Sequence, residues 1–142
     1  MSTSSTQSTS RQALVVHPAA PDMGETQRTA LGECIDAALA CSQACIAGAD
    51  SCLEEPDAVE LREVIRAQQN CATMCIAAVQ ILSRLGSDFG PTPGSVVPAL
   101  SDSCSRCREA CLEVANFYPH SRVSAHACER VLTSLRALAA LG

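Results

Sequence analysis

Ten cysteines at helical spacings are the feature that most constrains the fold of this 142-residue chain. The densest row, Cys34, Cys41, Cys45 and Cys52, lies in an alanine-rich run. At 100° per residue, a helix would hold these four side chains within a wedge about 40° wide. At 1.5 Å per residue the row would extend over about 27 Å. The row therefore predicts a long helix with one thiol-bearing face.

Two further stretches repeat this one-sided pattern, and one cysteine follows near the C-terminus. They are, in chain order, Cys71 and Cys75, then Cys104, Cys107 and Cys111, then Cys128. Spacings of three and four residues place side chains on the same helix face. The chain is therefore expected to fold into several helices that turn their cysteines toward a common interior.

Capping residues and prolines set the expected helix boundaries. Asp22-Met-Gly-Glu25 has the form of a capping box, and Pro56 would end the helix that begins there. Three more helices are expected at about residues 57–85, 96–118 and 121–141, and no stretch alternates with the period of a strand. The pattern predicts an all-α fold, an antiparallel up-down-up-down four-helix bundle with cysteines lining its interior.

The first 21 residues differ in composition from the rest. They are rich in Ser and Thr and end in Pro18 and Pro21, so residues 1–21 are expected to form a disordered tail and residues 22–142 the bundle. The tail lacks the apolar stretch of a secretory signal, and no uninterrupted apolar segment is long enough for a bilayer. We expect a cytoplasmic protein that does not enter a membrane. Reduced thiols there favour metal or redox chemistry over a disulfide framework.

Composition narrows the fold and the partners. Aromatic residues make up only 2% of the chain, so the core must be built from small and aliphatic side chains, which let helices pack closely. The formal net charge is −5, and no Lys is present. Such a surface has no basic stripe to neutralise a phosphate backbone, which argues against a nucleic-acid partner.

Counting residues from each expected turn predicts which thiols meet. One level is expected to hold Cys41, Cys71, Cys111 and Cys128. A second group near the start of the first helix is expected to hold Cys34, Cys75, Cys104 and Cys107, with Cys45 and Cys52 toward the other end. The arrangement predicts a thiol-lined channel along the bundle axis rather than one compact four-ligand site.

The distribution of thiols favours Cu(I) over zinc. A structural zinc site needs four ligands around one point, usually as two short pairs. Cu(I) is soft, is satisfied by two or three sulfurs, and accepts bridging thiolates. Pairs three or four residues apart, such as Cys41/Cys45 and Cys71/Cys75, would present two sulfurs from one helix to one ion.

The row CxxxxxxCxxxCxxxxxxC, the CxxxC of the second helix and the CxxCxxxC of the third resemble bacterial copper storage proteins over about residues 24–141. The resemblance implies a homotetramer of four-helix bundles that fills its core with several Cu(I) ions through inward cysteines. It implies sequestration of a toxic ion, with copper as the partner. The implied ligands are Cys34, Cys41, Cys45, Cys52, Cys71, Cys75, Cys104, Cys107, Cys111 and Cys128.

Two features depart from that family pattern. Gly48 stands where relatives often carry a further cysteine, and the fourth helix has only Cys128, with Val131 and Leu135 on its inner face. We therefore expect a lower copper capacity than in the richest members, with part of the bundle serving as an apolar core.

Other interpretations remain at this stage. Buried cysteines can be packing residues, cross-helix disulfides, or ligands of zinc or an iron–sulfur cluster. The main alternative function is a thiol redox or structural zinc module. An enzyme is not expected, since no inward Glu-x-x-His pair or Cys–His niche is evident. His120, before the fourth helix, is a candidate auxiliary ligand at the Cys52 end, although a solvated turn histidine is the simpler reading.

Overall fold

The computed structural model describes residues 7–84 and 93–141 and contains five α-helices in those ranges. Their bounds are α1 Thr9–Val16, α2 Glu25–Leu53, α3 Arg62–Leu82, α4 Pro93–Val114 and α5 Ser121–Ala140. Two short 3₁₀ segments, η1 Ala20–Asp22 and η2 Ala58–Leu61, precede α2 and α3. The described residues form no strand, as the sequence pattern predicts.

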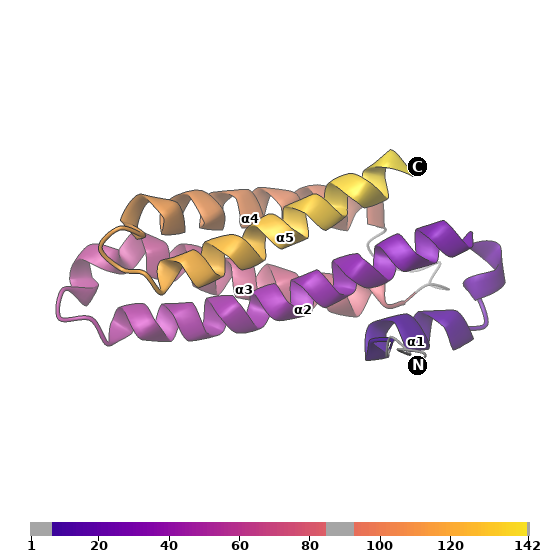
Figure 1. Cartoon of the computed structure of the whole chain (residues 1–142), viewed down its shortest axis with the longest axis horizontal. Coiled ribbons are helices and arrows are strands. Elements are labelled where there is room, and N and C mark those ends of the chain that lie inside the picture. Colours follow the sequence, from indigo (N-terminus) through magenta and orange to yellow (C-terminus); the bar gives the residue numbers. More distant parts are fainter. Residues whose placement is uncertain (1–6, 85–92, 142) are drawn as a thin grey trace, which may run out of the picture.

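Helices α2 to α5 form the expected bundle (Figure 1). Consecutive helices run in opposite directions, so α2 and α4 run one way and α3 and α5 the other. Helix α2 packs against α3 and α5, and α4 packs against the same two helices. The α2/α4 and α3/α5 pairs therefore face each other across the bundle axis, where side chains from all four helices meet.

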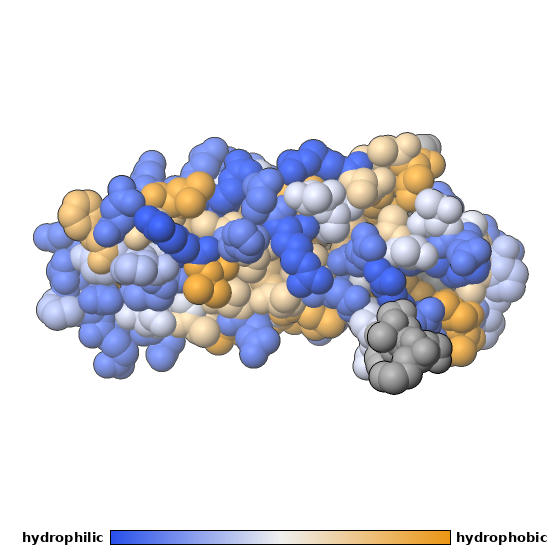
Figure 2. Space-filling view, viewed as in Figure 1, coloured by the Kyte–Doolittle hydropathy of each residue, from blue (hydrophilic) through white to orange (hydrophobic). Residues whose placement is uncertain are grey.

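The interior has two kinds of packing. The cysteines occupy much of the bundle's length, while aliphatic side chains fill the end where α2 begins and α5 finishes, among them Ile35, Leu82, Leu100, Val131 and Leu135. The burial of Val131 and Leu135 agrees with the expected apolar part of the fourth helix. Polar side chains cover much of the face seen in Figure 2, with smaller apolar areas between them.

The N-terminal segment differs from the disordered tail expected for residues 1–21. Helix α1 is capped by Ser8, whose hydroxyl accepts from the Arg11 amide at 3.2 Å. Leu14 is buried in the core cluster, and Arg11 forms an ion pair with Glu33 on α2 at 2.8 Å. The Ser8 cap and the buried Leu14 side chain together explain why this polar segment forms a helix that packs on α2. Residues 1–6 lie outside the described residues.

Helix starts also differ from the expected positions. Asp22 ends η1 instead of capping α2, whose N-cap is Gly24 without a side-chain hydrogen bond. After Asp57 the chain makes the 3₁₀ turn η2 before α3 begins, so α3 starts later than expected. Helix α4 begins at Pro93, a residue tolerated in a first turn, rather than near Val96 or Pro98, so Pro98 lies inside the helix. Most of the loop expected between the second and third helices lies outside the residues that the structure describes.

Helix α2 is long and apolar enough to resemble a membrane span, with a mean hydropathy of 1.3 over 18 residues. Half of that window is buried inside the bundle, which is what the core helix of a bundle requires. Its apolar character is therefore accounted for by packing against α3 and α5.

Candidate metal centre

All ten cysteines are free thiols with 0% of their surface exposed. Four come from α2, two from α3, three from α4 and one from α5, so every helix of the bundle contributes. Inward projection follows from the helical spacings, since residues three, four or seven apart fall on one face. The one-sided rows expected from the sequence are confirmed.

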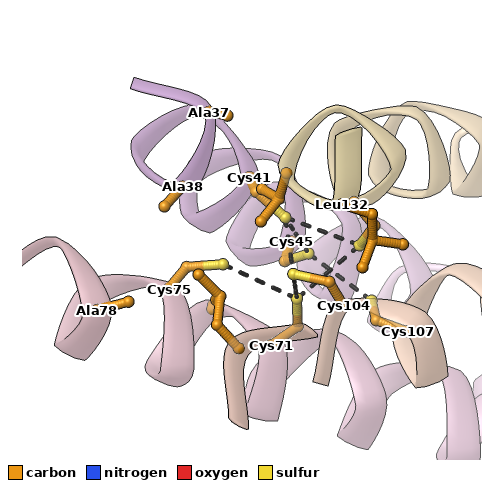
Figure 3. Packing of buried hydrophobic residues seen from close by; sticks show 14 of the residues in the cluster. Ala37, Ala38, Cys41, Cys45, Cys71, Cys75, Ala78, Cys104, Cys107 and Leu132 are labelled. Carbon is orange, nitrogen blue, oxygen red and sulfur yellow. Dashed lines mark hydrogen bonds between the residues drawn. The ribbon is translucent and has the colours of Figure 1, made fainter. Parts of the chain in front are cut away.

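Eight of the thiols form one continuous series of sulfur contacts. Figure 3 labels Cys41, Cys45, Cys71, Cys75, Cys104 and Cys107 of this series. The Cys71 sulfur is 3.8 Å from those of Cys41, Cys104 and Cys128, and 4.0 Å from that of Cys75. Cys41 and Cys128 are 3.7 Å apart. These contacts join all four helices at one level of the bundle.

The series continues from this level toward the end of α2. The Cys45 sulfur lies 3.9 Å from that of Cys41 and 3.8 Å from that of Cys107. Cys107 in turn lies 4.0 Å from Cys111. The thiols therefore form an extended row along the axis, as the channel prediction requires, rather than one isolated cluster.

Two groups of four sulfurs are compact enough to surround a metal ion. One consists of Cys41, Cys71, Cys75 and Cys104, the other of Cys41, Cys45, Cys71 and Cys128. Within each group the sulfurs all lie within 4.8 Å of one another. Because Cys41 and Cys71 belong to both groups, two ions could be held close together only by ligands that bridge them.

The register of α4 differs from the prediction. Cys104, not Cys111, lies at the level of Cys41, Cys71 and Cys128, while Cys107 pairs with Cys45. Cys75 also joins this central level instead of lying with Cys34. The predicted levels were wrong because α3 and α4 begin at other residues than expected. An error of one helical turn moves a side chain by about 5.4 Å along the bundle axis.

Cys34 and Cys52 stand apart from the series at its two ends. Cys34 lies on α2 about two turns before Cys41, near Ser134 of α5. The Cys52 sulfur accepts a hydrogen bond from Gln68 Nε2 at 3.6 Å. For both thiols burial is the main cause of a pKa raised above the ordinary 9.0, since a thiolate is poorly solvated there.

The pKa values of the clustered thiols are shifted in opposite directions. Contacts with neighbouring thiols, led by Cys104, lower the pKa of Cys71. The pKa of Cys107 is raised, with the contact to Cys111 as the leading cause, and the pKa of Cys128 is raised, led by the contact to Cys104. One thiolate can therefore be stabilised by surrounding S–H donors, while further ionisation is opposed by charge repulsion and burial. A cation is needed to draw several thiolates into this interior.

A buried polar group interrupts the thiol-lined interior beside Cys52. Gln68 of α3 and Ser124 of α5 are fully buried, and the Ser124 hydroxyl donates to Gln68 Oε1 at 2.7 Å. Both oxygens occupy the space beside Gly48, where a Cβ atom would lie 2.0 Å from Gln68 Oε1. The sequence analysis did not single out Gln68 or Ser124. Their positions one turn from Cys71 and Cys128, on the same inward faces, were the available signal.

His120 lies at the Cys52 end but outside the thiol groups. Its Nε2 is 3.1 Å from Glu55 Oε1, while its buried Nδ1 has no hydrogen-bond partner among the residues that the structure describes. The neighbouring Tyr118 hydroxyl donates to Asp57, and this bond leads the causes that raise the Tyr118 pKa to about 12. A contact between His120 and a cysteine is not among the described side-chain contacts, and its role as an auxiliary ligand remains a prediction.

Comparisons with known proteins agree with this geometry. The family model described as copper storage protein matches residues 27–140, which includes all ten cysteines. A comparison with curated proteins gives no match.

Solved structures give the same picture. A copper storage protein from Streptomyces lividans loaded with 10 copper equivalents is 35% identical, with a TM-score of 0.83 over 93% of this chain and 98% of that one. A second structure, described as a cytosolic copper storage protein from Streptomyces lividans with five coppers, is 35% identical, with a TM-score of 0.75 over 82% of this chain and 98% of that one.

Proposed function

This chain belongs to the copper storage protein family, and we propose that it stores several Cu(I) ions within its bundle through inward cysteine thiolates. The observation that carries the proposal is the continuous series of eight buried thiols, from Cys75 to Cys111, that joins all four helices. Packing alone would not require cysteine at every one of these positions, since alanine or valine would fill similar space.

The choice of Cu(I) follows from the donor set. Sulfur is the donor type of the series, and soft thiolates suit Cu(I), zinc and iron–sulfur clusters rather than harder ions. The two compact four-sulfur groups share Cys41 and Cys71, which suits bridging thiolates better than separate tetrahedral zinc sites. One Streptomyces relative is described as loaded with 10 copper equivalents and another with five coppers, which supports storage of several ions by this chain.

We assign the ligand role first to the eight thiols of the series. Cys34 and Cys52 are further ligands at the two ends of the series. Each of them needs a second ligand from another helix to hold a Cu(I) ion. His120 is at most an auxiliary ligand near Cys52, because its Nε2 already pairs with Glu55. Copper is cargo in this account, so the protein holds and releases ions and performs no catalytic step on them.

We place the protein in the cytoplasm, because one Streptomyces relative is described as cytosolic. The reducing conditions there keep closely spaced thiols from forming disulfides. Binding would replace S–H protons with a cation, so copper uptake releases protons to solvent. Sequestration inside a bundle also keeps the ion from reacting with other thiols in the cell.

We further propose that the bundle self-associates, as the family resemblance implies. Leu39, Ile46 and Leu53 are 46%, 56% and 54% exposed and recur every seven residues along α2. Ile76 of α3, also exposed, lines the same groove as Ile46 and Leu53. A heptad stripe of exposed aliphatic residues is typical of a helix that packs against a second copy. We assign this face to the subunit interface.

Competition between metals tests the function directly. Reduced protein is mixed anaerobically with one equivalent of Zn(II) and then titrated with Cu(I), and both metals are quantified on the protein after gel filtration. We expect Cu(I) to displace zinc and to continue binding beyond one equivalent. Retention of one zinc with little copper would instead support the structural zinc alternative.

A further inference from the structure

The side chains of Gln68 and Ser124, packed against Gly48, form a buried polar group that we call the polar plug. The three residues come from three different helices, α3, α5 and α2. Each lies one turn beyond a cysteine of the series, since Gln68 precedes Cys71 by three and Ser124 precedes Cys128 by four. Gly48 follows Cys45 by three. The next level of the bundle therefore has no thiol from these helices.

The plug is fixed in place by its own hydrogen bonds. The Ser124 hydroxyl donates to Gln68 Oε1 at 2.7 Å and lies 3.2 Å from the Ala44 carbonyl oxygen. The other end of the Gln68 carboxamide donates from Nε2 to the Cys52 sulfur at 3.6 Å. A buried amide that moved away without new partners would lose these bonds at a desolvation cost. Gln68 is therefore held across the space between Cys52 and the thiol series.

Gly48 makes room for this arrangement. A Cβ at that position would lie 2.0 Å from Gln68 Oε1 and 2.4 Å from Ser124 Oγ. Any larger side chain, a cysteine included, would thus collide with the polar pair. The Gln68 side chain can therefore occupy this space only because position 48 carries no thiol or other side chain.

Apart from Cys52 itself, the thiol expected nearest to this level is Cys111 of α4, one turn beyond Cys107. Cys111 lies 4.0 Å from Cys107 and contributes, after the main effect of burial, to the raised pKa of the Cys52 thiol. Cu(I) at Cys52 could take Cys111 as its second sulfur, but in doing so it would compete with the series for that ligand. Amide and hydroxyl groups do not replace thiolates as donors to a soft cation.

From this geometry we propose that Gln68, fixed by Ser124 beside Gly48, is a positioning residue that separates Cys52 from the central thiols, so that Cys52 holds a distinct and weaker copper site that fills last. The inference rests on the proposed storage function and specifies how that function is divided between the two parts of the interior. Each central thiol lies within 4.0 Å of another sulfur, whereas the described hydrogen-bond contact of Cys52 is with the Gln68 carboxamide, which leaves Cys111 as the sulfur that it could share.

Anaerobic Cu(I) titration against a competing chelator resolves the tight and weak steps of binding. In the unmodified chain we expect a final step about tenfold weaker than the preceding ones, which corresponds to ~1.4 kcal/mol. Cys52→Ser should remove that step alone and leave the tight steps unchanged. A loss in the tight steps of Cys52→Ser would overturn the proposal, because it would place Cys52 within the central cluster.

Thiols introduced at the plug test its role as a separator. Gln68→Cys and Ser124→Cys should each raise the capacity by about one ion and abolish the weak final step, since each continues the series toward Cys52. Asn70→Cys, which adds a thiol at an exposed position of α3 outside the groove lined by Ile46 and Ile76, is the matched control and should keep the weak step. If Gln68→Cys does not fold by circular dichroism, Ser124→Cys and Cys52→Ser decide the question.

The outcomes separate this proposal from the function on which it rests. Binding of at most one copper by the unmodified chain would remove the storage function itself. Binding of several coppers with no weak step, or with plug variants identical to the unmodified chain, would leave storage intact and contradict the separating role of Gln68.

Discussion

Cys71 on α3 and Cys128 on α5 lie 3.8 Å apart, sulfur to sulfur, although their helices face each other across the bundle axis. Cys45 on α2 and Cys107 on α4 make the same connection across the other diagonal, also at 3.8 Å. Thiols that meet across both diagonals must lie on the axis itself. An ion bound there would connect all four helices and would be enclosed by protein on every side.

Replacement of Cys71 should reduce copper capacity more than replacement of Cys34. The Cys71 sulfur contacts those of Cys41, Cys75, Cys104 and Cys128, and belongs to both compact groups, whereas Cys34 is outside the series. Each Cu(I) needs two or three sulfurs, so Cys71→Ser should lose roughly two ions and Cys34→Ser at most about one. Copper per chain after anaerobic loading and gel filtration measures both. Equal losses would show that the central level has no special role.

Copper affinity should fall as the pH is lowered. The pKa values of Cys34 and Cys52, raised mainly by burial, and of Cys107 and Cys128, raised mainly by neighbouring thiols, mean that these groups are protonated at neutral pH. Cu(I) must displace these protons, and two displaced per ion would weaken binding up to about 100-fold per pH unit. Chelator competition between about pH 6 and pH 8 tests this dependence. An affinity independent of pH would mean that the thiols are already ionised.

Gly48→Ala should destabilise the metal-free protein even though alanine favours helices. The helical preference of Ala over Gly is worth about 1 kcal/mol. The new Cβ would lie 2.0 Å from Gln68 Oε1, and forcing apart a packed, hydrogen-bonded pair costs about 1–3 kcal/mol. We expect the collision to outweigh the helical gain, with a net loss of about 1 kcal/mol.

Urea unfolding of reduced, metal-free protein, followed by circular dichroism, gives this value. Gly24→Ala, at the N-cap of α2, is the control for adding a Cβ without a collision, since the new atom meets nothing within 4 Å; the loss expected there is that of a less favourable N-cap residue only. A Gly48→Ala variant as stable as the parent chain would show that Gln68 is free to move aside, and would weaken the case for a fixed plug.

Ile46→Glu should disrupt self-association without unfolding the bundle. Ile46 is the centre of the exposed stripe with Leu39 and Leu53, and a carboxylate buried in an interface between copies is strongly disfavoured. Light scattering coupled to gel filtration should show a fall in molar mass to that of the monomer. Val123→Glu, at an exposed position on α5 outside the stripe, should retain the parent mass. If Ile46→Glu keeps that mass, α2 is not the interface.

The sequence was sufficient to predict the bundle and the inward cysteine faces, because both depend on local periodicity. The spacing of Cys34, Cys41, Cys45 and Cys52 allows only one face of a helix, and the structure buries all four. The level at which thiols from different helices meet could not be predicted, since it depends on where each connection lets the next helix begin. Cys104 therefore occupies the level expected for Cys111.

The polar plug and the N-terminal helix were missed for a different reason. Gln68 and Ser124 are polar residues whose burial depends on a partner from another helix and on the space left by Gly48. Helix α1 has a weak helical pattern, and its order depends on Leu14 and Arg11 contacting α2. Neither kind of long-range pairing is visible in local sequence patterns.

Native mass spectrometry of the reduced protein after anaerobic titration with Cu(I) tests the central claim most directly, because it counts the ions on each chain. The account predicts successive species with several Cu(I) per chain, retained in the presence of a competing chelator. Saturation at a single ion, or complete loss of copper to the chelator, would contradict storage in the thiol interior.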